Sequence, residues 1–171
     1  MHFNLNSPIV AGKTAAGFHI GRPYDDYAID FADARVVNYF KGFNLVREIN
    51  RNTGLLRVDG FRHDEGPWMY FGPDTVRLVF TSSGLLGCIY VWQGYIGAYG
   101  QAKIGSYLAA VSQTEQIEYD SGDEMYCRVD ANGEIITGLA IAATEVDSKM
   151  HETTPIDGFC VHDWSLFGRR S

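Results

Sequence analysis

Alternation of apolar and polar residues predicts two β-hairpins, each closed by a glycine. The first covers residues 74–92 and turns at Gly84, and the second covers residues 123–141 and turns at Gly133. Alternating apolar side chains lie on one face of a strand, which is typical of a half-buried sheet. Glycine supplies the positive φ that a short hairpin loop usually needs. We interpret the two hairpins as copies of one unit, although any two hairpins with glycine turns align about as well.

A glycine turn followed by a short helix precedes the strands in each half. Ile20-Gly21 leads into a helix that begins at Pro23 and carries an apolar stripe of helical spacing as far as Phe31. Ile104-Gly105 leads into a second helix, for which Ser106 is a suitable N-cap. The repeated order of turn, helix and hairpin favours an internal duplication.

The remaining pattern predicts more strands and sets the expected fold class. Strands are expected at residues 43–49, 55–61, 68–71, 116–119 and 159–167, the last at a sheet edge. We therefore expect an α+β fold, mostly antiparallel sheet with two or three short helices. It forms one domain over residues 1–171, with possible unequal halves 1–94 and 95–171.

Composition indicates a globular protein with a real core. The chain of 171 residues is 46% hydrophobic and 13% aromatic, which is enough to bury a core. Its start lacks a basic segment followed by an apolar run, and no stretch approaches the ~20 apolar residues of a membrane span. Cys88, Cys127 and Cys160 fall in strand-like runs, which favours buried thiols in a reducing compartment. We expect a cytoplasmic protein.

Charge is distributed unevenly along the chain. The net charge of −7 arises from residues 87–171, and no basic residue falls between Lys103 and Arg128. Five carboxylates lie in that gap. Such a surface repels nucleic acid and attracts a basic partner, although an acidic balance also favours solubility alone.

Catalytic motifs are missing from the sequence. Phosphate-binding loops, nucleophile elbows and zinc-protease motifs do not occur. His63-Asp64-Glu65 could supply metal ligands or an acid–base pair, but an ordinary polar turn explains it as well. Cys160, His162 and Asp163 are a weak triad candidate, because alternation places Asp163 on the other face of the strand. We expect no catalysis, no metal and no cofactor.

These features resemble two related groups of proteins. The turn-plus-helix units followed by antiparallel strands resemble the architecture of the β-lactamase inhibitor protein. The segment Ala-Gly-Phe-His-Ile-Gly-Arg-Pro-Tyr-Asp-Asp-Tyr (residues 16–27) is similar to the opening of bacterial toxin immunity proteins. The latter resemblance implies a cytoplasmic antitoxin of contact-dependent inhibition or type VI secretion systems. The inhibitor group is secreted and disulfide-bonded, which this chain's start and odd cysteine count do not match.

The acidic segment is the expected partner-binding site. Carboxylates interleaved with tyrosines suit the cationic substrate cleft of a nuclease, because charge speeds encounter and tyrosine supplies buried contact area. The expected partner is therefore a basic protein toxin, with no nucleic acid and no membrane. The candidate contact residues are Glu115, Glu118, Tyr119, Asp120, Asp123 and Glu124.

Two alternatives remain open. The aromatic side chains of Trp68, Tyr70, Tyr90 and Trp92 could line the pocket of a small-ligand-binding domain. His63-Asp64-Glu65 could serve an enzyme. A deep apolar cavity would favour the ligand binder, and a metal at His63 would favour the enzyme.

Overall fold

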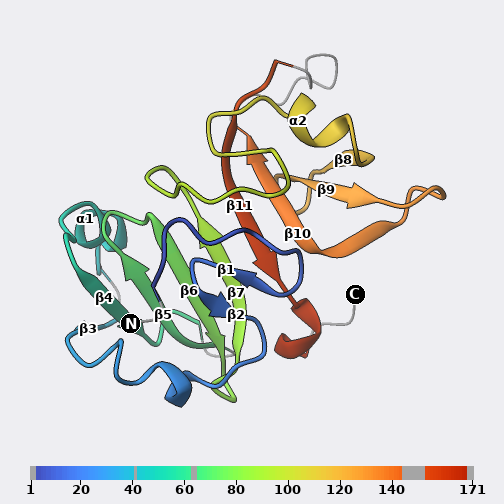
Figure 1. The fold of residues 1–171 in the computed structure, drawn as a ribbon. Coiled ribbons are helices and arrows are strands. Elements are labelled where there is room, and N and C mark those ends of the chain that lie inside the picture. Colours follow the sequence, from blue (N-terminus) through green and yellow to red (C-terminus); the bar gives the residue numbers. More distant parts are fainter. Residues whose placement is uncertain (1–2, 41, 63–64, 144–152, 169–171) are drawn as a thin grey trace.

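The computed structural model describes residues 3–40, 42–62, 65–143 and 153–168, and one large β-sheet dominates it (Figure 1). Within these residues the sheet has nine strands in the order β3-β4-β5-β6-β7-β11-β10-β9-β8. They are β3 (Arg35–Asn38), β4 (Leu55–Asp59), β5 (Glu65–Phe71), β6 (Val76–Thr81), β7 (Leu86–Val91), β8 (Ile117–Asp120), β9 (Met125–Val129), β10 (Ile135–Ala143) and β11 (Ile156–His162). Only the β3–β4 pair is parallel.

The expected α+β class is wrong, because the chain is mostly β. The α-helices among the described residues are α1 (Leu45–Asn50) and α2 (Ala109–Ser112). Short 3-10 helices cover Tyr24–Tyr27 (η1) and Trp164–Phe167 (η2), and β1 (Thr14–Ala15) pairs with β2 (Phe18–His19). Segments expected as helices therefore form single turns, whose apolar sides are too short to build a helical layer.

Two predicted strands differ from the structure. Residues 45–50 form α1, because the side chain of Asn44 accepts the N–H of Arg47 at 2.9 Å and caps the helix. The run at 159–167 is the central strand β11 followed by η2, and not an edge. Asp163 ends that strand by accepting the N–H of Ser165 at 3.0 Å.

The turns at Gly21 and Gly105 dock in the same way. The N–H of Gly21 donates to the carbonyl of Leu86 at 2.7 Å, and the N–H of Gly105 donates to the carbonyl of Ile156 at 2.7 Å. Both glycines have positive φ, +81° and +84°, which glycine adopts without strain. Leu86 begins β7 and Ile156 begins β11, so these two strands occupy matching places.

This match is what a repeat of turn, helical turn and strands would produce, although it would pair the hairpins differently from the prediction. Strands β4–β7 correspond to β8–β11, so the first hairpin matches β10–β11 and not β9–β10. The two halves join where β7 pairs with β11, with Tyr90 directly opposite Cys160. One continuous sheet results, and the strand order on one side of this pair mirrors the order on the other.

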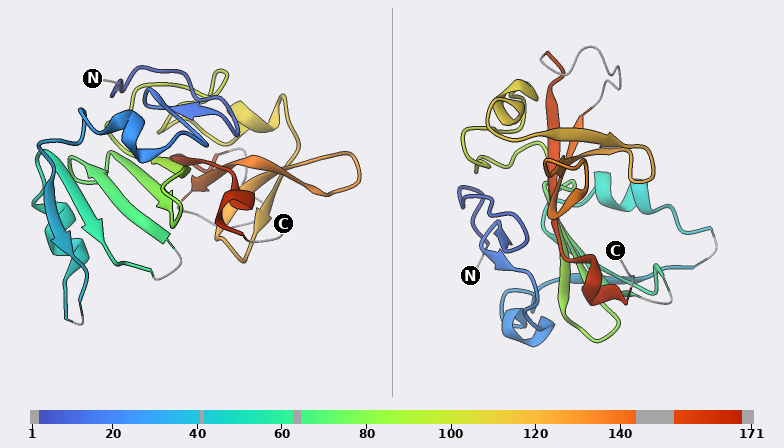
Figure 2. Two further views of the ribbon diagram at one scale, coloured as in Figure 1. Left: turned by 90° about the horizontal axis from the view of Figure 1, so that it is seen from below. Right: turned by 90° about the vertical axis from the view of Figure 1, so that its right-hand side faces the viewer.

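One face of the sheet, called the covered face, packs against the N-terminal arm (residues 3–34) and the connector (residues 93–116) (Figure 2). The main hydrophobic core lies there and includes fully buried Phe18, Leu78 and Phe159. The arm spans both halves. Phe3 stacks on Phe71 of β5, with ring centroids 4.3 Å apart, and the N–H of Gly12 donates to the carbonyl of Gly138 in β10 at 2.7 Å.

The other side of the sheet, called the opposite face, is covered unevenly. In the first half α1 and its flanking aromatics pack on Leu56, Val58 and Tyr70. Figure 2 shows α1 and η2 on this side and the arm on the other. At the junction, η2 packs against β7, where a Cβ added to Gly87 would lie 2.3 Å from the Phe167 ring. No α-helix of the described residues covers the second half here.

No helix in the described part of the chain has the length and apolar character to cross a membrane.

Candidate acidic binding site

A row of directly paired residues crosses the opposite face from one half to the other. In the first half it reads Leu56, Tyr70, Arg77 and Tyr90, and in the second Cys160, Ala140, Cys127 and Glu118. The first group is bulky and the second is small until the row ends at a carboxylate. The small side chains leave the second half hollow, and no α-helix in the part of the chain that the structure describes fills the space.

That hollow, called the acidic hollow, has a volume of about 630 Å³. Asp120 and Asp123 border it from the β8–β9 turn, and Glu134 borders it from the β9–β10 turn. Glu118 borders an adjoining depression of about 230 Å³, which shares Asp120 with the hollow. None of the described residues that line the acidic hollow is Lys or Arg. Three carboxylates therefore surround it without a bordering cation.

The two turns hold these carboxylates in place. The side chain of Asp130 accepts the N–H groups of Asn132 and Glu134 at 2.8 and 3.0 Å, which lowers the pKa of Asp130. Asp120 accepts the N–H of Gly122 at 2.8 Å. These local bonds fix the backbone of both turns, and the carboxylates project from it.

Two uncharged groups form the floor of the acidic hollow. Burial, followed by the charges of Asp120 and Asp123, raises the pKa of Cys127 to about 11. Burial lowers the pKa of His162 to about 4, although neighbouring Asp163 acts in the other direction. At neutral pH the thiol is protonated and the imidazole is neutral. Neither group offsets the negative charge above it.

The predicted contact residues divide between the two faces. Glu118, Asp120 and Asp123 lie at the acidic hollow or its adjoining depression. Tyr119 also lines the adjoining depression, but its ring packs edge-on against Tyr126 in the core of the covered face, with centroids 5.3 Å apart. Glu124 is exposed in the β8–β9 turn and does not border the acidic hollow.

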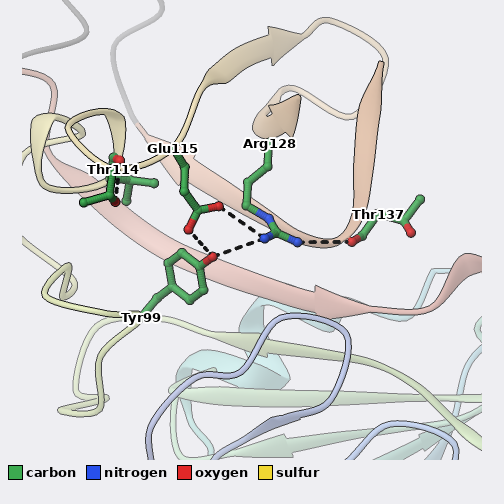
Figure 3. A network of polar contacts seen from close by, with 6 residues as sticks. Tyr99, Thr114, Glu115, Arg128 and Thr137 are labelled. Atoms are coloured by element: carbon green, nitrogen blue, oxygen red, sulfur yellow. Dashed lines mark hydrogen bonds and ion pairs between the residues drawn. The ribbon is translucent and has the colours of Figure 1, made fainter. Parts of the chain in front are cut away.

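Glu115 belongs to an internal network on the covered face (Figure 3). It forms an ion pair with Arg128 at 3.2 Å and accepts a hydrogen bond from the hydroxyl of Tyr99. Arg128 also donates to the carbonyl of Thr137 at 3.4 Å. Glu115 thus joins the connector to β9 and β10, and its charge is already paired.

Sequence reasoning missed three groups at this site. Glu134 follows Gly133 in a turn that the hairpin pattern located correctly, and the pattern alone could have drawn attention to it. His162 and Trp164 reach the hollow because β11 is central, with their rings stacked 4.6 Å apart. That placement depends on sheet order, which alternation does not contain.

The aromatic alternative is partly reproduced in the structure, but the chain fills its own aromatic cluster. Trp68, Tyr70 and Tyr90 lie on the opposite face, and the guanidinium of Arg77 sits over their rings at 5.7, 5.3 and 5.0 Å. Arg77 is ion-paired with Asp74. The neighbouring central cavity measures only about 150 Å³, whereas small-molecule pockets are typically about 300–1,000 Å³.

The enzyme alternatives gain no support from the geometry. His63 and Asp64 lie outside the described residues. Glu65 accepts the indole N–H of Trp68 at 2.7 Å. Asp163 caps η2, and burial raises the pKa of Cys160 well above its usual range, the reverse of an activated nucleophile. Among the described residues no group of three or more His, Cys, Asp or Glu side chains could hold a metal ion.

Comparisons of the chain with protein-family models, curated proteins and solved structures gave no match.

Proposed function

We propose that this chain is an immunity protein that binds and neutralises a basic protein toxin through the acidic hollow. The observation that carries the proposal is the set of carboxylates of Asp120, Asp123 and Glu134 around an uncovered hollow, with no bordering cation among the described residues. A basic side chain entering the hollow would meet uncompensated negative charge. Complementary charge of this kind speeds encounter and selects the partner.

The surroundings of the hollow support a protein partner. Trp164 forms one wall, and the exposed side chain of Ile135 (52% exposed) forms another. Aromatic anchors within a polar rim are common at the centres of protein interfaces. A toxin that presents Lys or Arg at its active site would therefore be occluded by the second half. A nuclease is the preferred class, because its substrate cleft is cationic.

The proposal places the chain in the cytoplasm of the toxin-producing bacterium, as part of a contact-dependent inhibition or type VI secretion pair. It needs no cofactor and no catalytic step. The resemblance of residues 16–27 to immunity proteins agrees with this role, and the acidic hollow supplies a physical basis independent of that resemblance.

Co-expression with toxins encoded beside this gene tests the proposal. The chain should protect cells from one such toxin, and the purified pair should form a complex. Asp120→Lys with Asp123→Lys should weaken binding at least tenfold and lower the association rate, because both charges border the hollow. The association rate of the unaltered pair should also fall as salt concentration rises.

Two controls change charge away from the hollow, and the second matches the size of the charge change. Glu124→Lys alters the same turn outside the hollow, and Asp25→Lys with Asp33→Lys makes the same change on exposed positions of the first half. Both controls should retain nearly full affinity. Equal losses in all variants would show a general charge effect and reject the hollow as the contact. Absence of protection from every neighbouring toxin would reject the immunity function.

A further inference from the structure

Two thiols meet at the junction between the halves. Cys88 lies in β7 and Cys160 in β11, and their Sγ atoms are 3.2 Å apart, although the residues are 72 positions apart in the chain. Both side chains are buried, with 0% and 1% exposure. Both are free thiols.

The register places the two thiols diagonally on one face. Cys88 is directly opposite His162, and Cys160 is directly opposite Tyr90. A disulfide bond is about 2.05 Å long, so closure requires the sulfurs to approach by about 1 Å. The backbones of diagonal neighbours are farther apart than those of directly opposed residues, so closure needs a small shift of β7 and β11 together with side-chain rotation.

The third thiol is in a different position. Cys127 is paired with Ala140, which is in turn paired with Cys160, so β10 separates the two cysteines. Two strand spacings amount to about 9.5 Å. Cys127 therefore cannot reach Cys160 without unfolding of the sheet.

The central cavity lies next to one of the paired thiols, and because Cys88 is 0% exposed, a small oxidant reaches its sulfur through local motion of the cavity wall. Cys88 borders the central cavity of about 150 Å³, together with Trp68 and Tyr90. Arg62, whose side chain is 51% exposed, forms part of the cavity's wall and connects it with the surface. Space of this size admits molecules as small as water or hydrogen peroxide but excludes a tripeptide thiol.

We propose that Cys88 and Cys160 form a modification site at which hydrogen peroxide closes a disulfide that clamps the two halves together. The Cys88 sulfur attacks one peroxide oxygen, the O–O bond breaks, and Cys88 becomes a sulfenic acid with release of water. The Cys160 sulfur then attacks the Cys88 sulfur and displaces the hydroxyl as a second water. In total, two thiols and one peroxide give one disulfide and two waters.

Closure is slow at neutral pH. Burial raises the pKa of Cys160, so its thiolate is scarce. The rate should therefore increase as the pH rises. Once closed, the bond is shielded from large reducing thiols by the same narrow cavity.

The full-length protein tests this inference directly. It is treated with hydrogen peroxide, freed of oxidant with catalase, and unfolded in an alkylating reagent before its mass is measured. The untreated protein should carry three alkyl groups and the oxidised protein one, on Cys127, with peptide mapping linking Cys88 to Cys160. Three alkyl groups after oxidation, or a link through Cys127, would overturn the proposal.

Single variants test the order of events. Cys127→Ser should still form the disulfide, whereas Cys88→Ser should not. Dimedone, which traps sulfenic acids and is added as the oxidised protein is unfolded, should label Cys88 in Cys160→Ser, and preferential labelling of Cys160 in Cys88→Ser would overturn the assigned order.

The melting temperature tests the clamp. The oxidised wild-type protein should melt about 5–10 °C above the reduced protein, because the bond closes a long loop. A disulfide form that melts at the same or a lower temperature would overturn the clamp. These outcomes do not depend on toxin binding.

Discussion

The two halves share a strand order but differ in what lies on their opposite faces. In the first half, Tyr70 and Arg77 fill the row, and α1 packs on Tyr70. At the matching places of the second half stand Cys127 and Ala140, and no α-helix of the described residues covers them. One copy has filled its sheet face with bulky side chains and a helix, whereas the other has left a hollow and surrounded it with carboxylates.

This difference between the opposite faces indicates that the two halves contribute differently to the protein. The first half gains stability from aromatic packing around an internal cation. The second half lacks that packing. The small side chains on its sheet face leave an open space, and the charged turns border that space. Under the proposed function, stability and recognition would thus be separated between two halves joined by one continuous sheet.

The largest expected effect tests whether the halves are one folding unit. Phe159→Ala in the central strand β11 should lower the free energy of unfolding by about 3–5 kcal/mol, because its ring is fully buried. Denaturation followed by tryptophan fluorescence and by circular dichroism should give one coincident transition. Ile136→Ala, at a 40% exposed position, is the control and should cost far less. Two separate unfolding transitions would show that each half folds alone, and the two halves could then not be compared as parts of one folding unit.

The next largest effect is the pH dependence of stability, which we expect to depend on His162 at the end of β11. His162 has its pKa lowered from about 6.5 in the unfolded chain to about 4 in the fold. The unfolded state therefore binds a proton more readily between these values, and about 3 kcal/mol of stability present above pH 6.5 is lost as the pH falls to 4. The matching residue of the first half is Trp92, which does not titrate. His162→Phe should flatten this part of the stability–pH curve, and an unchanged slope would assign it to other groups.

A somewhat smaller effect is expected at the internal cation. Arg77→Met should lower the free energy of unfolding by about 2–3 kcal/mol, because it leaves Asp74 unpaired and removes contacts with three rings. Arg22→Met removes a surface ion pair with Asp26 and should cost under about 0.5 kcal/mol. Urea denaturation measures both changes. Equal costs would show that the aromatic cluster does not stabilise the first half.

The smallest effect separates the two faces of the second half. Glu115→Gln should lower the free energy of unfolding by about 1–2 kcal/mol, because it weakens the network with Arg128 and Tyr99. It should leave toxin affinity unchanged, since the network lies on the covered face. Weakened toxin binding with an unchanged free energy of unfolding would instead show that Glu115 contacts the toxin.

Local pattern was sufficient to predict much of the strand content. Alternation located both hairpins, and the glycine turns at Gly21 and Gly105 identified the repeat. Alternation does not carry strand order, however. The run at 159–167 was expected at an edge, whereas β11 is central, because the pairing of β7 with β11 joins residues about 70 positions apart. The strand expected at 43–49 became α1 through a cap at Asn44 that the apolar pattern did not reveal.

The sequence predicted the residue types at the site, but not which of those residues come together. The sequence located the acidic segment, but it could not separate Asp120 and Asp123, which border the hollow, from Glu115, which is paired with Arg128. That separation depends on which face each side chain meets. Glu134 comes from the β9–β10 turn and His162 from β11, and the sheet order brings them to the same place.

The N-terminal arm has a consequence for how the chain reaches its native state. The arm is synthesised before the strands that it covers, and Gly12 is hydrogen-bonded to Gly138. During translation the part of the arm around Gly12 therefore lacks this partner until β10 has left the ribosome. Contacts of such high sequence separation slow folding, because a long loop must close before they form. We expect the part of the arm around Gly12 to stay unattached until the second half arrives, and chaperones to bind the polypeptide during that interval.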